Sequence, residues 1–227
     1  MYVGPLHSCA MTTDKHSGRD LVRTVASNHL GDAVFDLAEV ALDRNLSDGL
    51  LKEIPFVGTL VKIARAGQSI SEELFVRKLV RFLADLKNVP NDDRRKLLER
   101  YPDSSEQQRI LGENLLLALE RLDDVEKPAV LAKFFSAFIQ SQIDYTTFSR
   151  LAHALEKFNL ALFPNLRWFY TRQEPVVETP EEIIHELSLA GLVTARLAGS
   201  GTYGGSAAYE RSALGGTFLL LGFNVQS

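Results

Sequence analysis

Apolar residues recur every three to four positions along most of this chain, which is the spacing of one face of an α-helix. The pattern is clearest after Phe75, where Leu79, Phe82, Leu83 and Leu86 follow at that spacing. Between such stretches stand Pro, Gly or clusters of small polar residues, which end a helix or favour a turn. We therefore expect helices over residues 17–44, 55–66, 71–86, 92–100, 103–122, 124–139, 144–158 and 180–190.

The start of the helix at 71–86 carries a capping signature. Ser71 is the predicted N-cap, because its hydroxyl would accept a hydrogen bond from the first turn, where two glutamates follow. Ile70 and Phe75 occupy the two positions of a hydrophobic staple. We expect these two apolar side chains to pack against each other.

Two further segments have a distinctive composition. We expect the basic run in the helix at 92–100 to form a solvated face, namely Arg94, Arg95 and Lys96. We expect the aromatic segment at 164–170 to form a lid that closes the bundle, rather than a ligand site, with Trp168, Phe169 and Tyr170.

The composition changes towards the C-terminus, where eight of the fifteen glycines lie from Gly191 onward. After the helix at 180–190 we expect a short strand at 192–197, a Gly/Ser loop at 199–206 and a closing strand at 217–223. Helix, strand, loop and strand are the outline of half a winged helix. The expected fold is therefore mainly α, a multi-helix bundle with a small C-terminal winged-helix-like α+β module. The expected divisions are a disordered tail (1–18), a helical domain (19–173) and the winged-helix-like module (174–227).

Composition narrows the class of protein. The 227 residues suffice to bury a core, and 45% hydrophobic with 24% charged residues is typical of globular chains. The formal charge of -4 argues against non-specific nucleic-acid binding by the whole surface. Cys9 is the single cysteine, and residues 1–18 lack the pattern of a secretory signal. We therefore expect a cytoplasmic protein.

The stretch from 51 to 87 differs in charge from the rest, with seven basic and four acidic residues. In the helix predicted at 55–66, apolar residues lie beside Lys62 and Arg65, as in helices that lie on an anionic membrane. A core helix with a basic outer face has the same pattern, and the sequence leaves both interpretations open. The candidate membrane or partner contacts are Lys52, Phe56, Leu60, Val61, Lys62 and Arg65.

Two motifs resemble sites for chemistry but lack the required context. Residues 199–204 match G-x-G-x-x-G, yet a dinucleotide loop must open a helix within a βαβ unit, and a strand is expected instead. Glu182 and His185 form a single E-x-x-H pair, whereas a di-iron site needs two such pairs and two further glutamates. Nucleophile-elbow, P-loop and zinc-ligand spacings are absent from the sequence. We expect no catalytic, cofactor or metal site, and no small-molecule substrate is indicated.

The winged-helix outline raises a transcriptional regulator as the alternative function. Its reading helix, 180–190, carries Glu181, Glu182 and Glu186. From residue 176 to the end there are five acidic and two basic residues, whereas phosphate contacts need cations. The charge therefore favours a protein partner over nucleic acid.

Two segments together resemble a known group of proteins. The helical motif LKEIPFVGTLVKIARAGQSISEELFVRKLVRFL, and the end pattern HELSLAGLV followed by Tyr209 and ALGGTFLLLGF, are similar to bacterial proteins of the abortive-infection alpha type. The resemblance implies a non-enzymatic role in phage defence or stress. We expect an interaction protein that binds another protein or its own copy, with a DNA-binding regulator and a membrane-acting effector as alternatives.

Overall fold

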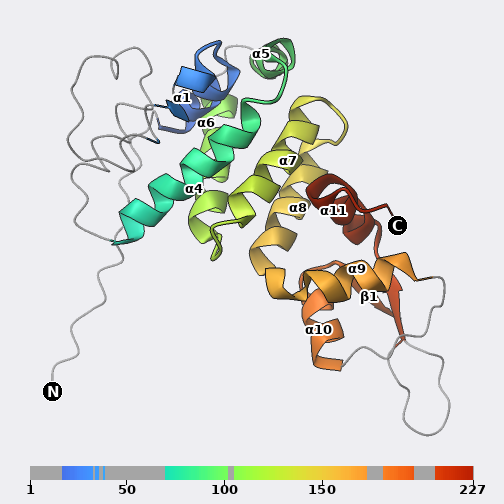
Figure 1. Ribbon diagram of the computed structural model, residues 1–227. Coiled ribbons are helices and arrows are strands. Elements are labelled where there is room, and N and C mark those ends of the chain that lie inside the picture. Colours follow the sequence, from blue (N-terminus) through green and yellow to red (C-terminus); the bar gives the residue numbers. More distant parts are fainter. Residues whose placement is uncertain are drawn as a thin grey trace, which may run out of the picture.

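A computed structural model describes residues 17–32, 34–35, 38, 70–101, 105–172, 181–196 and 208–226. This part of the chain is mainly helical with one small sheet, as the apolar spacing predicts (Figure 1). Its elements in chain order are α1 (Ser17–Ala26), α4 (Ile70–Leu86), α5 (Asn91–Arg100), α6 (Ser105–Arg121), α7 (Lys127–Ile139), α8 (Tyr145–Lys157), a 3-10 turn (Leu160–Leu162), α9 (Phe163–Thr171), α10 (Glu181–Leu189), β1 (Val193–Arg196), β2 (Ala208–Arg211) and α11 (Ala213–Phe223).

Helix α7 lies at the centre of the bundle, with α4, α5, α8 and α11 packed against it (Figure 1). The ring of Phe135 lies 5.9 Å from that of Phe82 on α4 and 5.4 Å from that of Phe148 on α8, measured between centroids. Such tilted aromatic pairs add to the energy of apolar burial. The apolar residues that recur at helical spacing along this helix are all buried, namely Leu131, Phe134, Phe135, Phe138 and Ile139.

Helices α1 and α6 cross at a pair of glycines. A Cβ atom built on Gly112 of α6 would overlap the backbone of Gly18 on α1, and one built on Gly18 would meet Arg109 O and Glu113 N. The two backbones therefore approach more closely than side chains would allow. This contact attaches the N-terminal helix to the bundle.

Two arginines of α5 bind the C-terminal ends of two other helices. Arg94 Nη1 donates to the carbonyl oxygens of Val25 and Ser27, both at 2.8 Å, where α1 ends. Arg100 donates to the carbonyl oxygens of Phe138 and Ile139, at 2.9 and 2.8 Å, where α7 ends. The last carbonyls of a helix have no partner within it, so a guanidinium is well suited to satisfy them.

The predicted solvated face of α5 is thus wrong at Arg94, which is only 6% exposed. Burial also lowers the pKa of its guanidinium from the ordinary value. Its neighbours Arg95 and Lys96 are exposed, as predicted. Arg94 is buried because it donates hydrogen bonds to backbone carbonyls at the end of α1, which lies far away in the sequence.

Two predicted details near helix ends are also wrong. The first helix does not run on from residue 17 through 44: α1 ends at Ala26, a turn follows, and helical residues resume at Leu30. Helix α4 begins at Ile70, and Ile70 is 79% exposed whereas Phe75 is 8% exposed, so they form no staple. With both residues inside one helix, their side chains point about 140° apart around its axis.

The C-terminal module contains the small sheet and one unexpected helix. β1 and β2 pair antiparallel with Val193 opposite Arg211, which confirms a strand after α10. The predicted closing strand at 217–223 is wrong, because these residues belong to helix α11. Ser212 caps this helix, its Oγ accepting a hydrogen bond from Gly215 N at 2.9 Å. A short apolar run does not by itself distinguish a buried helix from a strand.

Helix α11 packs the module onto the bundle. The ring of Phe218 lies 5.3 Å from that of Phe134 on α7 and 5.4 Å from that of Phe158 after α8. Figure 1 shows α11 beside α7 and α8, with α9, α10 and the sheet beyond it. Most of the predicted tail, all of the helix at 55–66 and the predicted boundary near 173 lie outside the described residues.

Candidate interaction site in the C-terminal module

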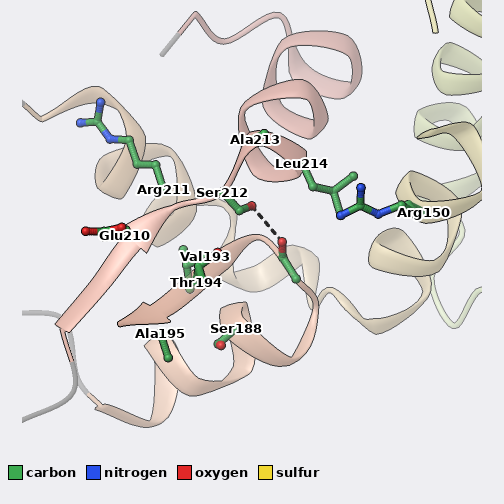
Figure 2. Close-up of a pocket in the computed structure, with 11 residues that line it drawn as sticks. Arg150, Ser188, Val193, Thr194, Ala195, Glu210, Arg211, Ser212, Ala213 and Leu214 are labelled. Atoms are coloured by element: carbon green, nitrogen blue, oxygen red, sulfur yellow. Dashed lines mark hydrogen bonds between the residues drawn. The ribbon is translucent and has the colours of Figure 1, made fainter. Parts of the chain in front are cut away.

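An open pocket lies where the sheet, α8, α10 and α11 meet, with a volume of about 590 Å³. Figure 2 shows Arg150 of α8 beside Leu214 on one side of it, and Ser188 and Thr194 from α10 and β1 on another. Its remaining walls come from Gly191, further residues of β1, the last residues of β2 and the first of α11. Helix α8 thus forms one concave surface with elements of the C-terminal module.

A glycine and a serine shape the floor of this pocket. Gly191 has a φ of 74°, a left-handed conformation that ends α10, and Leu192 N then donates to Leu187 O at 2.9 Å. Ser212 Oγ donates to Gly191 O at 2.9 Å, which is the dashed line in Figure 2. The N-cap of α11 is thereby tied to the end of α10.

Tyr170 of α9 joins the segments on either side of the sheet. Its hydroxyl donates to Leu192 O at 2.6 Å and accepts a hydrogen bond from Ser212 N at 2.9 Å. Burial raises the pKa of Tyr170 from its ordinary value, so this hydroxyl stays protonated near neutral pH. A Cβ atom on Gly215 would overlap this hydroxyl and Leu192 O, so α11 passes directly over the bond. The aromatic segment predicted to close the bundle therefore also anchors the C-terminal module.

We expect Tyr170→Phe to lower the free energy of unfolding by about 2 kcal/mol, because the buried Leu192 O and the partly buried Ser212 N lose their partner. Urea unfolding followed by circular dichroism measures the loss. Tyr145→Phe is the control, since the Tyr145 hydroxyl binds Asn114 in an exposed hydrogen bond of 2.8 Å. An equal loss in both variants would contradict a special role for Tyr170.

The charges around the pocket divide between structural and exposed groups. Arg211 is committed to the fold: it donates to Phe169 O and Arg172 O at the end of α9. The outward face of α10 is instead acidic and exposed, with Glu181, Glu182, His185 and Glu186. At its end Leu189 is 69% exposed, directly after the pocket residue Ser188.

A second group of buried charges lies at the loop between α6 and α7, and its contacts are structural. Lys127 is 1% exposed, and its Nζ lies 2.5 Å from Asp123 Oδ1 and 3.3 Å from Glu156 O. Lys78 donates to Glu120 O and Leu122 O at the end of α6, and burial lowers its pKa. Both lysines satisfy groups at helix ends, so we do not assign them to a site.

The candidate residues predicted from sequence fall into two sets. Lys52, Phe56, Leu60, Val61, Lys62 and Arg65 lie outside the described residues, as does the glycine motif at 199–204. Glu182 and His185 are both exposed on α10, where they belong to the acidic face. Within the described ranges, no cluster of three potential metal-binding side chains occurs. The helices placed by the structure include none that is both apolar and long enough to cross a membrane.

Among the residues of this module that the structure describes, Leu189 is the most exposed large apolar side chain. Sequence reasoning did not single it out, although helical spacing already places it on the side of Glu182 and Glu186, opposite Leu187. Comparisons of the chain with protein-family models, with curated proteins and with solved structures gave no match.

Proposed function

We propose that this chain is a non-enzymatic interaction protein whose C-terminal module binds another protein. The observation that carries this proposal is Leu189, a leucine that is 69% exposed at the end of an acidic helix face and directly follows the pocket residue Ser188. Burying one leucine side chain contributes roughly 1.5–3 kcal/mol, enough for a contact of this size to matter in binding. An apolar anchor surrounded by charge is a common arrangement in protein interfaces.

The charge of α10 indicates what kind of protein would bind. Glu181, Glu182 and Glu186 are exposed together on one helix, so a basic surface or peptide would be attracted to them. The same charge opposes DNA, whose phosphates require lysine or arginine on the contacting helix. We therefore infer a basic protein segment as the partner.

The order of elements supports a winged-helix-like description of this module as part of the proposal. Helix α10 is followed by the antiparallel pair β1 and β2, which is the order of a recognition helix and a wing. The exposed face of α10 is acidic, so the helix and the strand pair would contact a protein and not DNA. The resemblance of the sequence to abortive-infection alpha proteins is the reason why we propose a role in phage defence for this contact.

Leu189→Asp is expected to reduce capture of the partner at least tenfold, because it removes the apolar anchor without touching the core. The full chain, immobilised, is incubated with lysate of the organism that encodes it, and bound proteins are quantified by mass spectrometry. Val125→Asp is the matched control: Val125 is 54% exposed on the loop between α6 and α7, away from α10. Capture should also weaken with added salt and with Glu182→Lys, as expected for a basic partner.

Equal capture by the wild type and by Leu189→Asp would contradict the assigned surface. Tight, salt-sensitive binding to duplex DNA in an electrophoretic shift would contradict the choice of a protein partner. For the defence role, plaque numbers on cells that express the wild type should be lower than on cells that express Leu189→Asp. Equal plaque numbers would oppose that role.

A further inference from the structure

Helix α6 carries an exposed stripe on the side opposite its buried face. The helix packs inward through Leu111, Leu115 and Leu119, which are at most 3% exposed. Outward, Ile110 is 45% exposed and Leu117 is 46% exposed. The full stripe is Gln107, Ile110, Asn114, Leu117 and Arg121, all exposed. Its steps of three and four residues are those of a coiled-coil seam.

We propose that a second copy of this chain covers the stripe, with α6 packed antiparallel against α6 of the second copy about a two-fold axis at Asn114. This inference rests on the proposal that the chain is an interaction protein, but it uses a different surface and a different partner. The partner of Leu189 and the partner of α6 are therefore independent of each other.

The order of residues along the stripe is what selects a second copy. A two-fold interface places one patch against itself, so the patch must be complementary to its own reversed order. When two copies of the stripe lie antiparallel about Asn114, Ile110 of each copy faces Leu117 of the other. Asn114 then meets Asn114, and Gln107 at one end meets Arg121 at the other. Apolar residues thus meet apolar residues, and polar residues meet polar ones.

Electrostatics favour the antiparallel arrangement. Antiparallel helices place the negative C-terminal end of each dipole beside the positive N-terminal end of the other. Arg121, whose side chain is 61% exposed, would lie beside Gln107 and the acidic first turn of the second copy. A parallel pairing would instead bring Arg121 against Arg121. Like charges at close range weaken an interface.

Asn114 provides the polar contact at the axis. Its Nδ2 donates to the Tyr145 hydroxyl at 2.8 Å, which orients the amide on the surface of α6. The second amide hydrogen and the carbonyl oxygen are then placed to exchange hydrogen bonds with the other Asn114. A single asparagine in a coiled-coil seam is a known device for setting register.

Disulfide trapping tests the register directly. Cys9 is the only cysteine, so Cys9→Ser gives a background without thiols. In that background, Asn114→Cys should form a cross-linked dimer under mild oxidation roughly tenfold faster than Val125→Cys, because the axis holds the two thiols at high effective concentration. Gln107→Cys alone should stay uncrosslinked, whereas a mixture of Gln107→Cys and Arg121→Cys should link.

Mass photometry and sedimentation equilibrium of the full chain supply the second readout. The wild type should be a dimer at micromolar concentration, Leu117→Glu a monomer, and Val125→Glu a dimer. Circular dichroism of Leu117→Glu checks that the monomer is folded. If Leu117→Glu captures the partner of Leu189 as well as the wild type does, the two surfaces are separate. Leu189→Asp should remain a dimer.

Three results would overturn the proposal. One is a monomeric wild type at tens of micromolar, roughly the range in which a weak apolar seam would still associate. A second is trapping of Asn114→Cys no faster than of Val125→Cys. The third is self-linking of Gln107→Cys, which would mean a parallel pairing. None of these would affect the expected result at Leu189, so failure here is distinguishable from failure of the proposed function.

Discussion

Gly112→Ala is expected to lower the stability of this protein more than the other substitutions proposed here. The added Cβ would overlap the backbone carbonyl and Cα of Gly18. Backbone atoms cannot rotate away as a side chain can, so α1 and α6 must separate or distort. We expect the free energy of unfolding to fall by about 3 kcal/mol, at the upper end of what overpacking costs. For a chain of this length that corresponds to a melting temperature lower by roughly 6–12 °C.

Gly31→Ala is the matched control, because the substitution is identical and the surroundings are not. Gly31 is a helical residue with no atom within 4 Å of an added Cβ. Alanine there should stabilise by about 0.5–1 kcal/mol, through its higher helix propensity. Chemical unfolding of both variants should therefore give shifts of opposite sign. Stabilisation by alanine at both positions would show that α1 and α6 are not in close contact.

Arg94→Met is expected to have the second largest effect. The substitution keeps much of the side-chain length but removes the donors to Val25 O, Ser27 O and Val89 O, the last at 3.2 Å. Hydrogen bonds from a charged group contribute about 1.5–3 kcal/mol each, so we expect the free energy of unfolding to fall by about 3 kcal/mol. Hydrogen exchange should also speed up at the end of α1 before the rest of the bundle, since α1 loses the cap that joins it to α5.

Arg95→Met provides the comparison for Arg94→Met. Arg95 is the next residue of the same helix and has the same charge, but it is exposed. Its substitution should change the free energy of unfolding by less than about 0.5 kcal/mol, as is usual for surface positions. Arg94→Lys should lie between the two, because an ammonium cannot reach all three carbonyls in the geometry of the guanidinium. Equal stability of the Arg94 and Arg95 variants would contradict a buried capping role.

Much of the helical architecture could be predicted from local pattern. The apolar residues at helical spacing on α7 are buried, and the expected start of the next helix at residue 144 is where Asp144 caps α8, accepting a hydrogen bond from Thr147 N at 2.7 Å. The end of α10 is confirmed at Gly191, whose positive φ only glycine adopts without strain. These features depend on residues within about one or two turns of each other, so their physics is present in the sequence itself.

Two of the wrong predictions, the closing strand at 217–223 and the exposed Arg94, have a cause outside the local sequence. The apolar run at 217–223 became a helix because α7 and α8 cover one side of it and Ser212 caps its start. Arg94 became buried because the end of α1 lies beside α5. In both places the packing partner is more than fifty residues away, so no window of local sequence contains it. The Ser212 cap, by contrast, is a local feature.

The candidate site shows the same division. Sequence alone established an acidic helix followed by a glycine stop and a strand. Helical spacing also separates Leu189, on the side of the glutamates, from Leu187, and the structure shows the first exposed and the second buried. Only the tertiary structure showed that Arg150 of α8 lies beside the end of this helix and forms a pocket with it. For the stripe on α6 the structure was needed, since Ile110 and Leu111 are neighbouring apolar residues of which Ile110 is 45% and Leu111 is 3% exposed.

The sequence by itself determined where most of the described helices lie and which of their residues are apolar. The tertiary structure alone decided which apolar residues face water, which charges are buried, and where two backbones touch at Gly18 and Gly112. The physical reason is that helix formation and capping depend on groups within a few residues, whereas burial depends on which distant surface arrives to cover each face.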